Sequence, residues 1–308
     1  MDALGEVNPR EQHRDGESLL FNPHTYDPSL LDDETRRLLR ATIDWFEHRG
    51  KERLLEDYRD GVSQDRRYLL YNPVTKMKMT TEDERVIELL WDVIAAKGFE
   101  RDTYFRGAGR DIGAPPKLEG TVHVNLALIL KFMQSYLFAP TAQPPVPTRQ
   151  DRADDEFLFP QGPARGLGNV TFADWRLAFE PFADLPNVAE FGERAEGFTT
   201  LMRTAAPDSD QQLDLDFRLV LGQLFTLVVD EQLVLEQARL TGLDRDVLDT
   251  IFEVFGRDFS ARAVELHGKA SSTDAQQQWA LANVRKPVID TARFERVWEQ
   301  VVRSLTPT

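Results

Sequence analysis

The amino-acid sequence predicts an almost wholly α-helical protein. Apolar residues recur at helical spacing through most of the chain, and no stretch alternates with period two over enough residues to indicate a β-strand. The candidate helices are bounded by cap residues, glycines and prolines. With 308 residues and 41% hydrophobic content, the chain can bury a sizeable core. We therefore expect an all-α helical bundle of one large or two modest domains.

The composition argues against several kinds of function. A net charge of -15, from 52 acidic and 37 basic residues, disfavours nucleic acid or an anionic membrane as the main partner. The absence of cysteine excludes disulfides, thiolate metal sites and cysteine nucleophiles. His24, His48 and His267 have no ligand partners at metal-binding spacings, so no metal site is predicted. Because the first residues carry no secretory signal and no apolar run is long enough for a membrane span, we expect a cytoplasmic protein.

The N-terminal part of the chain divides into a tail, two helices and a linker. Residues 1–18 are polar and aperiodic, which indicates a disordered tail. Two helices are expected next, one from about residue 33 to Gly50 and a short one from Lys51 to Tyr58. The first has five apolar residues at helical spacing, namely Leu38, Leu39, Ile43, Trp45 and Phe46. The polar stretch Arg59–Arg67 has no hydrophobic period, so we expect an exposed linker.

The next segment, up to residue 138, is predicted to be a helix, a loop and a second helix. Asn72-Pro73 marks a turn, and Thr81 with Glu84 forms a capping box at the start of the first helix. Residues 122–138 are largely apolar and form the second helix, which we expect to be buried. The proline-rich and charged stretch 139–156 is the predicted connector between a unit at 19–138 and a helical domain at 157–308.

The C-terminal domain is predicted to start with an irregular loop at 157–175 and to continue as helices. Five helices are expected, at residues 187–203, 208–239, 244–267, 274–282 and 290–304. Gly242 is the expected end signal of the second and longest of them.

The polar loop between the two helices of the 81–138 segment carries Arg110 and Asp111 and ends in a tight turn that presents a single carboxylate. Pro115-Pro116 stops any helix before Glu119, Gly120 permits a sharp turn, and Thr121 can cap the following helix. Glu119 is therefore expected at or just before a helix N-terminus. Such a position suits either a structural cap or a positioned general base.

Three motifs in this region carry a resemblance to a known family. Gly98-Phe99, Arg110-Asp111 and Glu119-Gly120-Thr121 have the order and separations found at the end of the helical C-terminal domain of acyl-CoA dehydrogenases. The chain from about residue 21 to 305 is most similar to the long actinobacterial members, which carry an extra helical region after E-G-T. Residues 21–58 resemble the family's N-terminal helices, and residues from about 64 resemble its later C-terminal helices. The middle β-domain and its flanking helices have no counterpart between them.

The resemblance implies FAD-dependent α,β-dehydrogenation of an acyl thioester, carried by CoA or by a carrier protein. Such an enzyme is an oxidoreductase of fatty acid metabolism and a homo- or hetero-oligomer. It implies that Glu119 is the catalytic base that removes the α-proton, and that the backbone at Glu119 and Gly120 contacts the thioester. Burial by flavin and acyl chain would raise the carboxyl pKa toward that of the α-proton.

The resemblance also assigns cofactor contacts. Thr121 and His123 match positions that approach the FAD, although a glutamine is more usual in the family at the position of His123. The alternative is that His123 has its hydrogen bonds satisfied at the helix start and has no contact with a cofactor. The family's Q-x-x-G-G stretch, which meets the FAD of a neighbouring subunit, corresponds to Asp92, Ala95 and Ala96 in this chain.

The absent β-domain bears directly on the expected activity. In the family, that domain packs the flavin ring and much of the acyl thioester. The resemblance therefore implies either a dehydrogenase that is incomplete and needs a partner chain, or a non-catalytic helical scaffold derived from the family. Bound flavin would distinguish the two.

Overall fold

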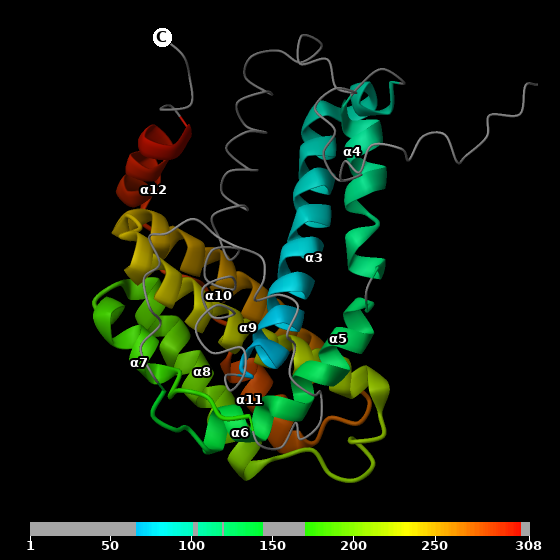
Figure 1. Cartoon of the computed structure of the whole chain (residues 1–308), viewed down its shortest axis with the longest axis vertical. Coiled ribbons are helices and arrows are strands. Elements are labelled where there is room, and N and C mark those ends of the chain that lie inside the picture. Colours follow the sequence, from blue (N-terminus) through cyan, green and yellow to red (C-terminus); the bar gives the residue numbers. More distant parts are fainter. Residues whose placement is uncertain (1–65, 101–103, 119, 144–169, 303–308) are drawn as a thin grey trace, which may run out of the picture.

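The computed structural model describes residues 66–100, 104–118, 120–143 and 170–302. All regular structure in these ranges is helical, which confirms the predicted all-α bundle (Figure 1). The tail expected at 1–18, the helices expected between residues 33 and 58, and most of the linker 59–67 lie outside the described residues. The same is true of the connector from residue 144 to 156.

The first described helix, α3 (Tyr68–Ile94), begins well before the predicted start at Thr81. The capping box was a wrong prediction, because the Thr81 hydroxyl donates to the carbonyl oxygen of Met77 at 2.8 Å in the middle of the helix. Pro73 lies inside α3, where it removes one backbone donor. Burial of apolar side chains around it offsets this cost. These buried side chains are Leu70, Tyr71, Val74 and Met77.

The end of the predicted exposed linker belongs to the start of α3. The carbonyl oxygens of Arg66 and Arg67 accept hydrogen bonds from the backbone N–H groups of Leu69 and Leu70, at 3.0 and 2.9 Å. Arg67 is only 7% exposed. The expectation of an exposed linker is therefore wrong at its last residue, because the helix that it joins extends back to this point.

After α3 the chain folds back on itself. It passes through η2 (Ala95–Phe99), α4 (Tyr104–Ile112) and η3 (Pro115–Lys117), then through α5 (Val122–Ile129), η4 (Leu130–Phe132) and α6 (Met133–Phe138). α4 lies beside α3 (Figure 1). The predicted loop is therefore wrong at Arg110 and Asp111, because both residues belong to α4. At the turn, Trp91 stacks on Phe99 with 5.2 Å between ring centroids. A Cβ at Gly98 would lie 2.2 Å from the Trp91 ring, so only glycine fits this turn.

Five C-terminal helices agree with the predicted ranges. They are α8 (Pro186–Thr204), α9 (Leu215–Thr241), α10 (Arg245–His267), α11 (Asp274–Ala282) and α12 (Thr291–Val297) with the π-helical turn η8 (Trp298–Val302). α7 (Arg176–Phe179) with η7 (Glu180–Phe182) precedes them and was not predicted. α9 begins later than the predicted residue 208, because Asp214 is its N-cap and accepts from Phe217 N–H. Gly242 ends α9 with a φ of 66°, as predicted.

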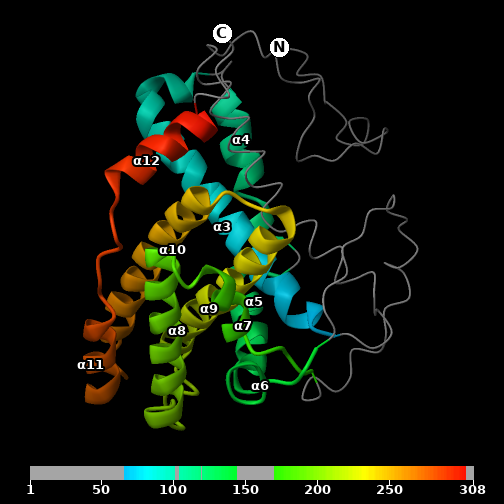
Figure 2. The same cartoon turned by 90° about the vertical axis from the view of Figure 1, so that its left-hand side faces the viewer.

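α9 is the central helix of the core. Figure 2 shows α8, α10 and α11 on one side of α9 and α5 on the other. The ring of Tyr136 on α6 lies 5.3 Å from that of Phe225 on α9 and 5.5 Å from that of Phe172. The Tyr136 hydroxyl also donates to the side chain of Gln232. Residues on both sides of the 144–169 gap thus share one core, and the helices that carry the Glu119 loop rest on a rigid base.

Candidate functional site

The loop between η3 and α5 carries the predicted base. Glu119 itself lies outside the described residues, but its neighbours on both sides are described. Leu118 is extended, with φ -91° and ψ 154°. Gly120 has a φ of 98°, a left-handed conformation that favours glycine. Thr121 is the N-cap of α5, and its side chain accepts from the N–H of Val124 at 3.5 Å. The predicted turn and cap are therefore confirmed.

Lys76 of α3 fixes this loop from the side. Its ammonium donates to the carbonyl oxygen of Leu118 and, at 2.8 Å, to that of Gly120. These are the carbonyl groups of the residues directly before and after Glu119. The side-chain amide of Asn125 also donates to the Gly120 carbonyl, at 3.2 Å. One cation and one amide thus hold the backbone on both sides of the predicted base, and charge-assisted bonds of this kind are the stronger ones.

Several described side chains around the loop are exposed. Thr121 and His123 are exposed, as are the apolar side chains of Leu118 (58%) and Val124 (59%). The apolar cavity in the described part of the chain lies elsewhere, against α10. The described residues on both sides of Glu119 therefore do not form a closed, apolar site.

The other predicted cofactor residues lie at the far end of α3. Asp92 and Ala96 are both exposed. Asp92 follows Lys76 by sixteen residues along the helix, which corresponds to about 24 Å. The structure therefore does not bring Asp92 and Ala96 together with Thr121 and His123. The resemblance assigns the Asp92 end to the FAD of a neighbouring subunit, so it does not require the two ends to meet within one chain.

Ala95 has a backbone conformation that alanine rarely adopts. Its φ is 52° and its ψ is -138°, and it is the one non-glycine residue with positive φ in the described ranges. Alanine is strained in this region of φ and ψ, and glycine is not. The resemblance matches Ala95 to the first glycine of the family's Q-x-x-G-G stretch. The backbone thus has a glycine conformation where the family has a glycine.

The described residues do not by themselves fit FAD. A flavin needs an enclosing wall for its ring and positive or donor groups for its pyrophosphate. Thr121, His123 and Ala96 are all exposed, and Asp92 places an acid at the edge that the resemblance assigns to the cofactor. In the described part of the chain no group of three acidic, histidine or cysteine side chains could hold a metal ion. Within the same ranges, no helix has the length and apolar character needed to cross a bilayer.

A second polar cluster lies on the opposite side of α3. Lys78 follows Lys76 by two residues, which is about 200° around the helix. Its ammonium lies 2.7 Å from Glu82 and 3.2 Å from Asp258 of α10. Burial acts to lower the pKa of Lys78, but Glu82 and Asp258 outweigh burial, so the pKa is raised. Arg85 also contacts Asp258, at 3.0 Å, so this cluster joins α3 to α10.

Two carboxyl groups near this cluster have raised pKa values. Burial, together with the charge of Asp230, raises the pKa of Glu231 on α9 well above its ordinary value. Neither oxygen of Glu231 has a hydrogen-bond partner among the described residues. Partial burial, followed by the charge of Glu82, raises the pKa of Asp83 to about 6. Neither group lines the cavity against α10, so we assign them no chemical role.

Sequence reasoning identified the loop but missed the residues that hold it. Lys76 belongs to no motif, and the early turns of α3 were hidden by the turn signal Asn72-Pro73. The amphipathic pattern on both sides of that proline was the available signal. Comparison of the chain with protein-family models, with curated proteins and with solved structures finds no match.

Proposed function

We propose that this chain is the helical component of an acyl-thioester dehydrogenase, in which it supplies Glu119 as the base and a partner chain supplies the rest of the site. The observation that carries the proposal is the pair of hydrogen bonds from Lys76 to the carbonyl groups on both sides of Glu119. A loop held at both flanking peptides positions one side chain, which is what a general base requires. The glycine-like backbone of Ala95 is a second point of agreement with the family.

The proposed role of Glu119 is to accept the α-proton of a bound acyl thioester. A carboxylate open to water is a poor base for such a weak acid, because its ordinary pKa is near 4. Closure of the site by a partner would remove water and raise that pKa. The exposed apolar side chains of Leu118 and Val124 are suited to such closure. The partner would also hold the flavin, which the described residues of this chain do not fit.

The experiment uses the full chain with an affinity tag in its native host, compared with two variants. The wild-type chain purified alone after heterologous expression should be colourless and inactive with acyl-CoA and an artificial electron acceptor. The complex captured from the host should contain flavin and oxidise acyl-CoA. In that complex, Glu119→Gln should retain the flavin and lose activity at least a hundredfold, because the amide has no basic oxygen. Full activity of the Glu119→Gln complex would show that the base lies elsewhere.

The second candidate is a non-catalytic helical scaffold that binds a partner through the same open face. The exposure of Leu118 and Val124 is the observation that favours it. A scaffold predicts that Leu118→Ser with Val124→Ser abolishes capture of the partner, whereas Glu119→Gln changes neither binding nor any activity of the complex. Absence of flavin from a captured complex would favour the scaffold over the dehydrogenase.

A further inference from the structure

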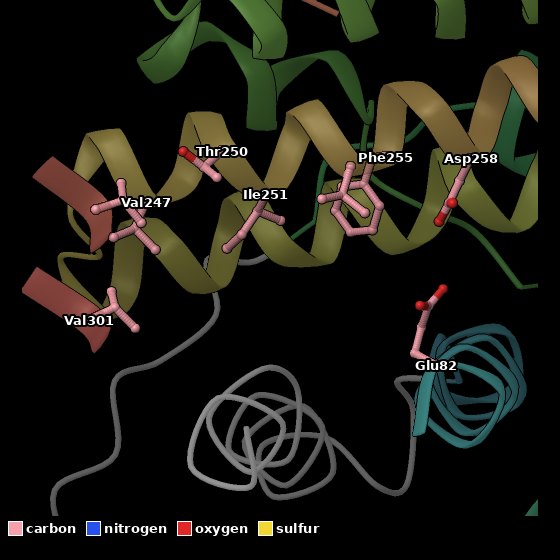
Figure 3. A pocket seen from close by; sticks show the side chains of 9 residues that line it. Glu82, Val247, Thr250, Ile251, Phe255, Asp258 and Val301 are labelled. Atoms are coloured by element: carbon pink, nitrogen blue, oxygen red, sulfur yellow. The ribbon is translucent and has the colours of Figure 1, made fainter. Parts of the chain in front are cut away.

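An apolar groove runs along α10, on the side of the molecule away from the Glu119 loop. Its cavity has a volume of about 210 Å³. Figure 3 shows Val247, Ile251 and Phe255 of α10 pointing into one space that Val301 of η8 and Glu82 of α3 enter from opposite ends. The remaining lining residues are Thr250, Val254, Asp258 and Val297.

Ion pairs hold the two walls of the groove against α10. On one wall, Arg293 of α12 pairs with Asp249 and, at 3.0 Å, with Glu253. On the other wall, Arg85 of α3 pairs with Asp258 at 3.0 Å. Arg293 is 4% exposed, so its pairs are buried and resist opening. The groove is therefore a fixed feature of the fold, with an apolar floor between two anchored helices.

The groove lacks the polar groups that orient a small ligand. Its charged lining residues, Glu82 and Asp258, are already paired with Lys78 and Arg85. The hydroxyl of Thr250 already donates to its own helix at 2.8 Å. Small-molecule sites combine apolar walls with a few polar groups aimed at the ligand. An apolar side chain of a protein segment fits this lining better.

We propose that the groove binds the N-terminal segment 33–49 of the same chain as an amphipathic helix. The sequence of this segment places its apolar residues on one face, and that face needs a partner. These residues are Leu38, Leu39, Ile43, Trp45 and Phe46. A cavity of about 150 Å³ accepts a benzene molecule, so the groove has room for one or two such side chains below a helix that lies over it.

The connecting chain is long enough for this arrangement. Glu82 follows Arg66 by sixteen residues, which corresponds to about 24 Å along α3. Residues 50–65 join the proposed helix to Arg66. If 51–58 is helical, as the sequence predicts, it spans about 12 Å, and seven extended residues add about 23 Å. The segment can therefore reach the groove without displacing α3.

Disulfide trapping in the full-length chain tests the proposal, because the native chain has no cysteine. Val254→Cys on the groove is combined with one cysteine on the apolar face of the segment, at Leu39, Ile43 or Phe46. Each face position has a control one residue later, on another side of the helix, at Arg40, Asp44 or Glu47. Because a disulfide requires Cα atoms within about 7 Å, the best face pair should form an intramolecular bond at least tenfold faster than its control.

Each trapping outcome decides the proposal. Equal rates for face and control positions would show that the linker merely tethers the segment, and would overturn the proposal. Disulfide-linked dimers without intramolecular bonds would assign the groove to a second copy instead. Failure of every face pair to form an intramolecular disulfide would also overturn it.

A second measurement does not depend on the register of the helix. Val254→Asp places a charge in the groove, and Val264→Asp places the same charge on an exposed site of the same helix. Trypsin should cut after Arg36, Arg37 and Arg40 at least tenfold faster in Val254→Asp than in Val264→Asp or in the wild type, because a segment expelled from the groove is accessible. Equal cleavage rates in all three proteins would refute docking.

Discussion

Lys76 offers the most direct test of how the Glu119 loop is held. We predict that Lys76→Met destabilises the protein by about 1–2 kcal/mol. The substitution keeps most of the aliphatic stem and removes the two bonds from the ammonium to Leu118 and Gly120. Hydrogen bonds to a charged group contribute about 1.5–3 kcal/mol each. Lys76 is half-buried, so water replaces part of each bond, and we reduce the contribution to about 0.5–1 kcal/mol per bond.

Two measurements check this prediction. Urea unfolding at pH 7 gives the change in the free energy of unfolding, and hydrogen exchange followed by mass spectrometry reports on residues 113–121. The matched control is Lys131→Met, on the exposed side of η4, which should change neither quantity. Exchange in residues 113–121 should become about 5–30 times faster in Lys76→Met, the factor that corresponds to 1–2 kcal/mol. Equal behaviour of the two variants would refute the idea that Lys76 holds the loop.

Two further substitutions test strain and pH dependence. Ala95→Gly should stabilise the protein by about 1 kcal/mol, because glycine adopts a positive φ without strain. The control Ala96→Gly should destabilise it. If thermal unfolding ranks the two variants in the opposite order, Ala95 is not strained. The pKa of Asp83 is about 6 in the folded protein, above its ordinary 3.8, so the wild type loses stability as pH rises from about 4 to 6. Asp83→Asn should therefore raise the free energy of unfolding by about 1 kcal/mol above pH 6, after discounting for partial exposure, and should leave it unchanged below pH 4. Urea unfolding measures this change, and the exposed control Asp92→Asn should show no increase at either pH.

The helix boundaries that could be predicted from the sequence are those set by local chemistry. Asp244 accepts from the N–H groups of Asp246 and Val247 at the start of α10. Thr273 forms a complete capping box with Gln276 at the start of α11. These caps need only a few consecutive residues, so the pattern contains the whole cause.

The start of α3 could not be predicted because tertiary packing decides it. Asn72-Pro73 is a turn signal in an isolated peptide, but here Leu70, Tyr71 and Val74 are buried in the core shared with α9. Each such burial is worth roughly 1.5–3 kcal/mol, and together they exceed the cost of one proline near a helix start, which is about 3 kcal/mol. Local propensity was outweighed by contacts between residues that are far apart in sequence.

The same reasoning explains which part of the candidate site the sequence could predict. Gly120 acts through its own backbone and Thr121 through a side-chain contact three residues away, and both were predicted in their observed roles. The ammonium of Lys76 reaches the loop across 42 residues of sequence, and no local pattern contains that contact. The strain at Ala95 is likewise visible only in the backbone geometry.

The Glu119 loop and the α10 groove lie on opposite sides of α3, so their functions can be separated by experiment. Lys76 bonds to the loop, whereas Lys78, about 200° around the same helix, bonds to the groove residues Glu82 and Asp258. A partner that closes over Glu119 would meet the exposed side chains of Leu118 and Val124, next to the carbonyl groups that Lys76 holds. It follows that Val254→Asp should release the N-terminal segment without accelerating exchange at residues 113–121. Lys76→Met should do the reverse, and a variant that did both would mean that α3 transmits a change from one surface to the other.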